Sequence, residues 1–151
     1  MNYYGVTRQT ADVDFLITRS DFEKILPELE REGYRKDDVQ EVFARLGGHR
    51  SHLMDLDFLF VDQRTLDKMI PESRQVVIVG RKFLIPSLLH LIALKLHAMK
   101  HNLKIRELKD LPDIVDLIRV HRVNVRGKEF KEVCLKYGSE EIYRKVLHYV
   151  L

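Results

Sequence analysis

The sequence contains little cysteine, proline or glycine. Its 151 residues include one cysteine, four prolines and seven glycines. The single cysteine, Cys134, cannot form an internal disulfide, and it has no cysteine partner for a zinc knuckle. With 45% hydrophobic and 32% charged residues, the composition indicates a globular fold rather than a disordered chain. The length suits one domain or two small subdomains.

Long apolar runs are absent as well. No window of about 18 apolar residues occurs. Met1 is followed by NYYGVTRQT, not by the basic and then apolar segment of a secretion signal. We therefore expect no membrane span and no secretion signal, and a cytoplasmic location.

Charge is unevenly distributed along the chain. Residues 1–80 carry 11 Lys and Arg against 15 Asp and Glu, whereas residues 81–151 carry 15 against 8. Such asymmetry favours a polyanion partner such as a nucleic acid. Solvated helix faces rich in Lys and Arg would give the same counts, so both interpretations stay open.

Two segments with strand-like alternation carry paired aspartates. TADVDFLIT, residues 10–18, contains Asp12 and Asp14, and HLMDLDFLFV, residues 52–61, contains Asp55 and Asp57. Residues i and i+2 of a strand point to the same face, so each pair lies on one side of its strand. If the two strands are neighbours, three or four carboxylates share a face. A hard divalent cation needs such oxygen ligands, and an acidic face turned to solvent is the alternative.

The remaining patterns predict an α/β sheet region at 1–85 and a helical region at 86–151. The first region includes a helix opened by a Ser20–Glu23 capping box, an ambiguous segment EVFARLGG, a short helix QRTLDKMI, and a hairpin with a Gly80-Arg81 turn. The helical region begins with Ser87 as N-cap and contains three further helices. Pro112 could mark the first turn of the second helix, which would then start at Lys109 or Asp110.

In this order, four segments resemble the nucleotidyltransferase-fold proteins of bacteria and archaea, in particular the abortive-infection toxin type. The similarity covers about residues 3–118 and rests on YYGVTRQTADVDFLI, DFLFVDQRTLDKM, IPSLLHLIALKLHAMKHN and KDLPDIVDLI. It implies a mixed β-sheet with flanking helices, followed by a C-terminal helical bundle. It further implies metal-dependent transfer of a nucleotidyl group from an NTP to a hydroxyl of RNA, protein or a small molecule. An antitoxin partner belongs to the same expectation.

The resemblance also assigns roles to particular residues. Asp12 and Asp14 match the metal-binding pair, and Asp57 matches the third carboxylate better than Asp55 does. The bound ion would be Mg²⁺ or Mn²⁺. Arg8 and Thr10 match the residues just ahead of the pair and are expected, with Lys95, at the nucleotide. The "KD..D" formed by Lys109, Asp110 and Asp113 matches positions typical of the helical half.

One feature of the family is not found in this sequence. Its members carry a Gly-Gly or Gly-Ser turn about a dozen residues before the paired aspartates, where backbone N–H groups hold the triphosphate. Here eleven residues precede Asp12, and Gly5 is the only glycine among them. We expect either a longer native chain or a catalytically inactive binding or regulatory module. A missing first helix would expose apolar surface on the sheet, which would favour a homodimer.

Two further residue groups have a local interpretation. Lys95 lies on an apolar helical stripe, where its amine must reach solvent or meet an anion, namely a triphosphate or the cluster of strand aspartates described above. Lys109 and Asp113 have the spacing of an ordinary i, i+4 ion pair. His97 and His101 share a helix face, but Ala98 stands where a zinc metalloprotease has its glutamate. We expect exposed histidines there rather than a zinc site.

Overall fold

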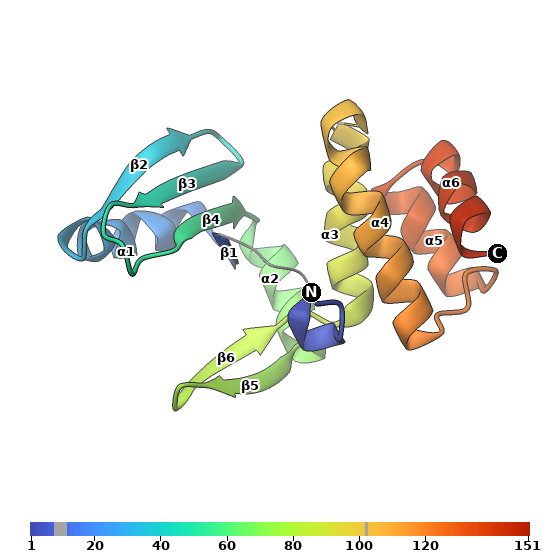
Figure 1. Ribbon diagram of the computed structural model, residues 1–151, viewed down its shortest axis with the longest axis horizontal. Coiled ribbons are helices and arrows are strands. Elements are labelled where there is room, and N and C mark those ends of the chain that lie inside the picture. Colours follow the sequence, from blue (N-terminus) through green and yellow to red (C-terminus); the bar gives the residue numbers. More distant parts are fainter. Residues whose placement is uncertain (8–11, 102) are drawn as a thin grey trace. The chain divides into compact units, whose positions relative to one another are not determined.

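The computed structural model describes residues 1–7, 12–101 and 103–151. Its contacts divide the chain into two compact units (Figure 1). The sheet unit comprises Gln9–Pro71, and the helical unit comprises Met1–Arg8 together with Glu72–Leu151. The chain therefore has the expected α/β class, with a mixed sheet and C-terminal helices. The assignment of domains at 1–85 and 86–151 stays a prediction.

The described strands of the sheet unit form one mixed sheet in the order β1-β4-β3-β2. Strand β1 pairs with β4 in parallel, and the β4–β3 and β3–β2 pairs are antiparallel. The parallel pair joins the two segments that carry the aspartates. The elements of this unit are β1 (Asp12–Ile17), α1 (Arg19–Arg31), β2 (Tyr34–Val39), β3 (Phe43–Gly48), β4 (Asp55–Phe60) and α2 (Gln63–Met69).

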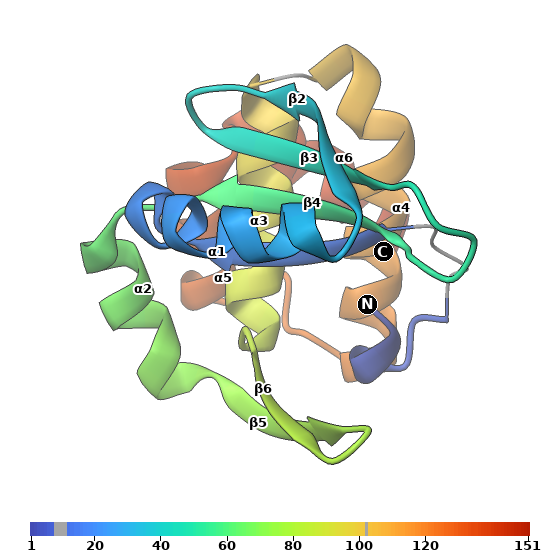
Figure 2. The same ribbon diagram turned by 90° about the vertical axis from the view of Figure 1, so that its left-hand side faces the viewer.

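Helix α1 covers one face of this sheet (Figure 2). The Phe22 ring on α1 lies 5.0 Å from the Phe58 ring and 5.0 Å from the Phe60 ring of β4, measured between centroids. Alternation places Phe58 and Phe60 opposite in direction to Asp55 and Asp57. One face of the sheet is thus buried under α1, and the aspartates lie on the other. The buried core consists of Phe22, Ala44, Leu46, Leu56 and Phe58.

Local details of the sheet unit differ from the sequence analysis in two places. Thr18, not Ser20, is the N-cap of α1, because its hydroxyl accepts the Asp21 N–H at 3.1 Å. Ser20 lies inside the first turn, so the capping-box assignment was wrong. The ambiguous EVFARLGG segment forms strand β3, and the preceding β2 was not recognised because its mostly exposed residues carry no apolar alternation.

The helical unit contains a hairpin and a helical bundle. The α3 helix opens as expected, with the Ser87 hydroxyl accepting the His90 N–H at 3.3 Å. Helices α3 to α6 enclose a core that includes Leu96, Ile114, Phe130 and Val146. The remaining elements are η1 (Asn2–Tyr4), η2 (Ile70–Glu72, which begins in the sheet unit), β5 (Arg74–Ile78), β6 (Arg81–Ile85), α3 (Leu88–His101), α4 (Leu103–His121), α5 (Lys128–Tyr137) and α6 (Glu140–Val150).

Two sequence expectations for this unit are corrected. The hairpin turn consists of Val79 and Gly80, one residue earlier than Gly80-Arg81, because Ile78 pairs with Arg81. Both turn residues have positive φ, 49° and 74°, as in a type I′ turn. Pro112 lies inside α4 and not in its first turn. Leu111, Ile114 and Val115 around the proline are buried, so packing sustains the helix through it.

The N-terminal segment packs within the helical unit. The Tyr4 hydroxyl donates to the Pro86 carbonyl at 2.5 Å, and the His121 ring nitrogen lies 2.9 Å from the Tyr4 carbonyl. These contacts tie η1 to the segment just before α3 and to the last residue of α4. Over the described residues, no helix combines the length and the apolar character that a membrane crossing requires.

Candidate active site

The parallel β1–β4 pairing brings the two aspartate pairs onto one face of the sheet. Asp12 lies opposite Asp55, and Asp14 lies opposite Asp57. Side chains of residues that face each other on neighbouring strands point to the same side. The four carboxylates therefore occupy one surface, which we call the acid face, with Asp14 exposed and Asp57 buried. Neighbouring strands lie about 4.8 Å apart, which brings the rows close enough to interact.

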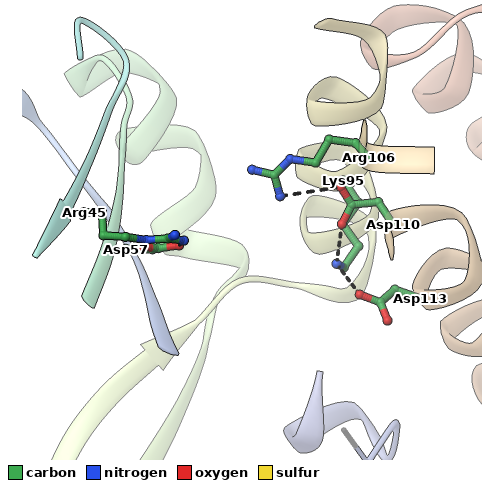
Figure 3. Close-up of polar contacts among 6 residues, drawn as sticks. All are labelled: Arg45, Asp57, Lys95, Arg106, Asp110 and Asp113. Carbon is green, nitrogen blue, oxygen red and sulfur yellow. Dashed lines mark hydrogen bonds and ion pairs between the residues drawn. The ribbon is translucent and has the colours of Figure 1, made fainter. Parts of the chain in front are cut away.

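Arg45 on β3 extends this row of charges. It lies opposite Asp57 in the antiparallel β3–β4 pairing. Its Nε donates to Asp57 Oδ1 at 2.7 Å, and its Nη2 donates to Asp57 Oδ2 at 2.5 Å (Figure 3). This hydrogen bonding, followed by the charges of Asp57, Asp12 and Asp55, raises the pKa of the Arg45 guanidinium. The acid face thus contains a cationic side chain of its own.

Asp55 has a different environment. Its Oδ1 accepts the backbone N–H of Gly48 at 3.0 Å, which anchors the end of β3. Next to it, Gly47 is covered by the carboxylate of Asp37, because a Cβ at that glycine would lie 2.4 Å from Asp37 Oδ2. Asp55 therefore has a structural contact. This agrees with the resemblance, in which Asp57 matches the third metal-binding carboxylate better than Asp55 does.

In the described part of the chain, no group of three or more His, Cys, Asp or Glu side chains converges as a metal ion would require. The donor types nevertheless suit a hard cation, since Asp12, Asp14 and Asp57 supply only carboxylate oxygens. Both oxygens of Asp57 are turned to Arg45. To bind one metal ion together, the side chains of Asp12, Asp14 and Asp57 would have to rotate toward one another on this face.

Lys95 contacts two aspartates within the helical unit. Its Nζ lies 3.0 Å from Asp110 Oδ1 and 2.7 Å from Asp113 Oδ2, both on α4 (Figure 3). The three side chains are 13%, 4% and 8% exposed, respectively. These partners belong to α4, whereas the sequence analysis considered a triphosphate or the aspartates of the two strands as the anion for Lys95. Arg106 adds a longer contact, 3.9 Å from its Nη1 to Asp110 Oδ2.

The other sequence candidates have simpler outcomes. Arg8 and Thr10 lie outside the described residues. Lys109 is exposed, while Asp113 is bonded to Lys95 from the neighbouring helix. The exposed His97 and His101 rings lie 4.4 Å apart on α3, as their spacing predicts. Partial burial, followed by the charges of His101 and Lys100, lowers the pKa of His97.

Sequence reasoning missed Arg45. A signal was present, because Arg45 alternates with buried Ala44 and Leu46 in β3 and so must point away from the α1 face. Recognising its role required knowing that β3 pairs with β4. That pairing joins segments separated by a turn with no strong hairpin signature.

Comparison with known proteins identifies the family of the chain. The search of curated proteins finds no match to the chain. A family model described as "Uncharacterised nucleotidyltransferase" matches residues 5–150, which is nearly the whole chain. The protein therefore belongs to this nucleotidyltransferase family.

Proposed function

We propose that the acid face is the catalytic surface of a metal-dependent nucleotidyltransferase. Asp12, Asp14 and Asp57 would hold Mg²⁺ or Mn²⁺, and an NTP would be the nucleotidyl donor. The observation that carries this proposal is the register of β1 against β4, which sets Asp14 opposite Asp57 on the face not covered by α1. Family membership supports nucleotidyl transfer as the reaction class.

The aspartates of the acid face differ in solvent exposure, and we assign their roles accordingly. Exposed Asp14 and partly exposed Asp12 are accessible to an ion that arrives with its nucleotide. Buried Asp57 is held at a defined position by its neighbours on the sheet. A bound divalent ion would supply charge neutralisation of the phosphates and orientation of the attacking hydroxyl.

The proposed reaction is a displacement at the α-phosphorus of the NTP. The acceptor oxygen forms the new bond to phosphorus, the bond from the α-phosphorus to the bridging oxygen breaks, and pyrophosphate leaves. The acceptor proton passes to a carboxylate of the acid face or to water. The acceptor belongs to one of three classes that the sequence analysis left open: RNA such as tRNA, protein, or a small molecule.

Three further residues complete the proposal by resemblance. Arg8, Thr10 and Lys95 match family positions near the nucleotide. The same likeness extends the proposal to the toxin type, with an antitoxin partner. A homodimer, which the sequence analysis expected from apolar surface on the sheet, is also part of the proposal. In the helical unit, Lys95 is held by Asp110 and Asp113, so its proposed contact with phosphate needs an exchange of partners.

A specific contact supports a second candidate function. Because Arg45 already neutralises Asp57, the fold is compatible with a catalytically inactive module that binds or regulates a partner. In that case the aspartates would have a structural role on a charged sheet face. The two candidates differ in whether the acid face turns over NTP.

Transfer of labelled nucleotide separates the candidates. The purified protein is incubated with each of four α-³²P-labelled NTPs and Mg²⁺ or Mn²⁺, together with total RNA, total protein or a small-molecule extract. We expect metal-dependent labelling that Asp14→Asn abolishes and Asp67→Asn retains, because exposed Asp67 lies on α2 and not on the acid face. No labelling by wild type with any NTP, metal or acceptor would favour the inactive module.

A further inference from the structure

Arg45 binds both oxygens of the carboxylate that the proposed function assigns to the metal. The two donor–acceptor distances are 2.7 and 2.5 Å. A guanidinium that grips a carboxylate by two parallel N–H bonds gains direction as well as charge neutralisation. In this state both oxygens of Asp57 are bonded to Arg45 on β3.

Arg45 lies where its positive charge can neutralise the carboxylates of the acid face in the absence of a bound cation. Asp14, Asp57 and Arg45 lie in one row across three adjacent strands, because each is the register partner of the next. Asp12 and Asp55 lie close enough for their charges to act on the guanidinium. Without a cation, four carboxylates on one sheet face would repel one another.

We propose that Arg45 and the divalent ion compete for Asp57. In the metal-free protein, Arg45 neutralises Asp57; on metal binding it releases Asp57 and turns its guanidinium to the phosphates of the nucleotide. This inference rests on the proposed function and deepens it, since it names the residue that couples metal loading to triphosphate binding. Arg45 is a positioning residue for Asp57 in the first state and a phosphate ligand in the second.

The competition follows from charge and from geometry. An ion bound to Asp57 would place a double positive charge next to the guanidinium, and like charges at that distance repel. In addition, the oxygens that the ion needs are the ones to which Nε and Nη2 donate. Release of Arg45 removes both obstacles.

The surroundings of Arg45 allow it to move. Its side chain is 45% exposed, whereas that of Asp57 is 12% exposed. Its guanidinium carbon lies 5.9 Å from the centre of the Phe43 ring, on the same face of β3. A ring at this distance attracts a cation and would keep a released guanidinium near the acid face. Its bonds to Asp57 use two of the five N–H donors of an arginine, so others remain to meet phosphate oxygens.

The first test measures Mn²⁺ affinity without nucleotide, from the free Mn²⁺ signal in electron paramagnetic resonance. Wild type is compared with Arg45→Gln, Arg45→Met and the control Arg35→Gln. Arg35 is exposed on β2 and shares the acid face, since it pairs with Gly47. We expect Arg45→Gln to bind Mn²⁺ at least about fivefold more tightly than wild type, because the adjacent positive charge is gone. Arg35→Gln should differ from wild type by less than about twofold.

The second test measures affinity for inorganic triphosphate in the presence of saturating Mn²⁺, by calorimetry. In this test the effect of the substitution is opposite to that in the first. Arg45→Gln should bind triphosphate at least about fivefold more weakly than wild type, because a phosphate ligand is lost. A merely structural role of Arg45 would not strengthen one affinity and weaken the other. Far-ultraviolet circular dichroism checks that each variant is folded.

The outcomes separate this inference from the proposed function. Metal binding by wild type that Arg45→Gln leaves unchanged or weakens would overturn the competition and leave the metal site standing. No Mn²⁺ binding by wild type or by any folded variant would reject the metal site itself, and the inference with it. If Arg45→Gln does not fold, Arg45→Met, which also lacks the positive charge, is measured in its place. Tighter Mn²⁺ binding than wild type supports the competition, and equal or weaker binding refutes it.

Discussion

Asp14 on β1 lies directly opposite Asp57 on β4, although more than forty residues separate them in the chain. The parallel pairing turns both carboxylates to the face that α1 does not cover. Parallel strands need a crossover connection, and here α1, β2 and β3 lie between the two partners. The candidate site therefore depends on how the sheet is assembled and not on a contiguous motif.

Metal binding should stabilise the protein through this pair. Mn²⁺ at about 100 times its dissociation constant should add about 2.7 kcal/mol to the free energy of unfolding. Asp14→Asn should lose most of the resulting rise in melting temperature, since it removes an exposed carboxylate ligand. Thermal melts with and without Mn²⁺ measure this. Asp67→Asn on α2 is the control, and an unchanged response of Asp14→Asn would remove Asp14 from the metal site.

Lys95 should be essential for the stability of the helical unit. Lys95→Met leaves Asp110 and Asp113 buried without their main counter-charge, which typically costs about 3–5 kcal/mol. Lys100→Met, at an exposed position of the same helix, should change stability by less than about 0.5 kcal/mol. Urea unfolding monitored by circular dichroism compares them. Equal small effects of the two variants would show that the Lys95 contacts contribute little.

Thr18 and Ser20 provide a test of the cap assignment. Thr18→Ala removes the acceptor for the Asp21 N–H and should destabilise the protein by about 1 kcal/mol. Ser20→Ala should cost less than about 0.5 kcal/mol, because Ser20 caps no backbone N–H of α1. Chemical denaturation gives both values, and the reverse order would favour the capping box that the sequence suggests.

Val79 is a site for stabilisation. It is 97% exposed and has a φ of 49°, a conformation that a β-branched residue disfavours. Val79→Asn supplies the Asn-Gly pair that type I′ turns prefer and should stabilise the protein by about 0.5–1 kcal/mol. Melting temperature is the measurement. Val77→Asn, in a neighbouring exposed strand position, should not stabilise; a gain there as large as at residue 79 would argue for a solubility effect instead.

Cys134 should make stability depend on alkaline pH. Burial raises the pKa of its thiol from 9.0 to about 12, so the folded state holds this proton more tightly than the unfolded state. The contribution is therefore complete below pH 9 and is lost as pH rises toward 12. Between about pH 8 and pH 10.5, the stability of wild type should fall more steeply than that of Cys134→Ala. Parallel slopes of the two unfolding free energies against pH would contradict this.

Much of the local structure could be predicted from the sequence, because short-range physics determines it. Alternation around Asp12 and Asp57 identifies strands β1 and β4, and the Ser87 cap with the apolar run behind it identifies α3. Errors arose where neighbouring signals compete. Thr18 and Ser20 are both good caps, and the hairpin turn was displaced by one residue because Val79 is an unfavourable turn residue.

By itself, the sequence determined most of the elements other than β2 and β3, the α/β class and the fact that each aspartate pair shares one side of its strand. Only the tertiary structure decided that β1 lies beside β4, that Arg45 grips Asp57, and that Lys95 meets Asp110 and Asp113. The physical reason is the distance along the chain over which the interactions act. Caps, turns and alternation act over a few residues, whereas these charge pairs join residues brought together only when the sheet forms and the helices pack.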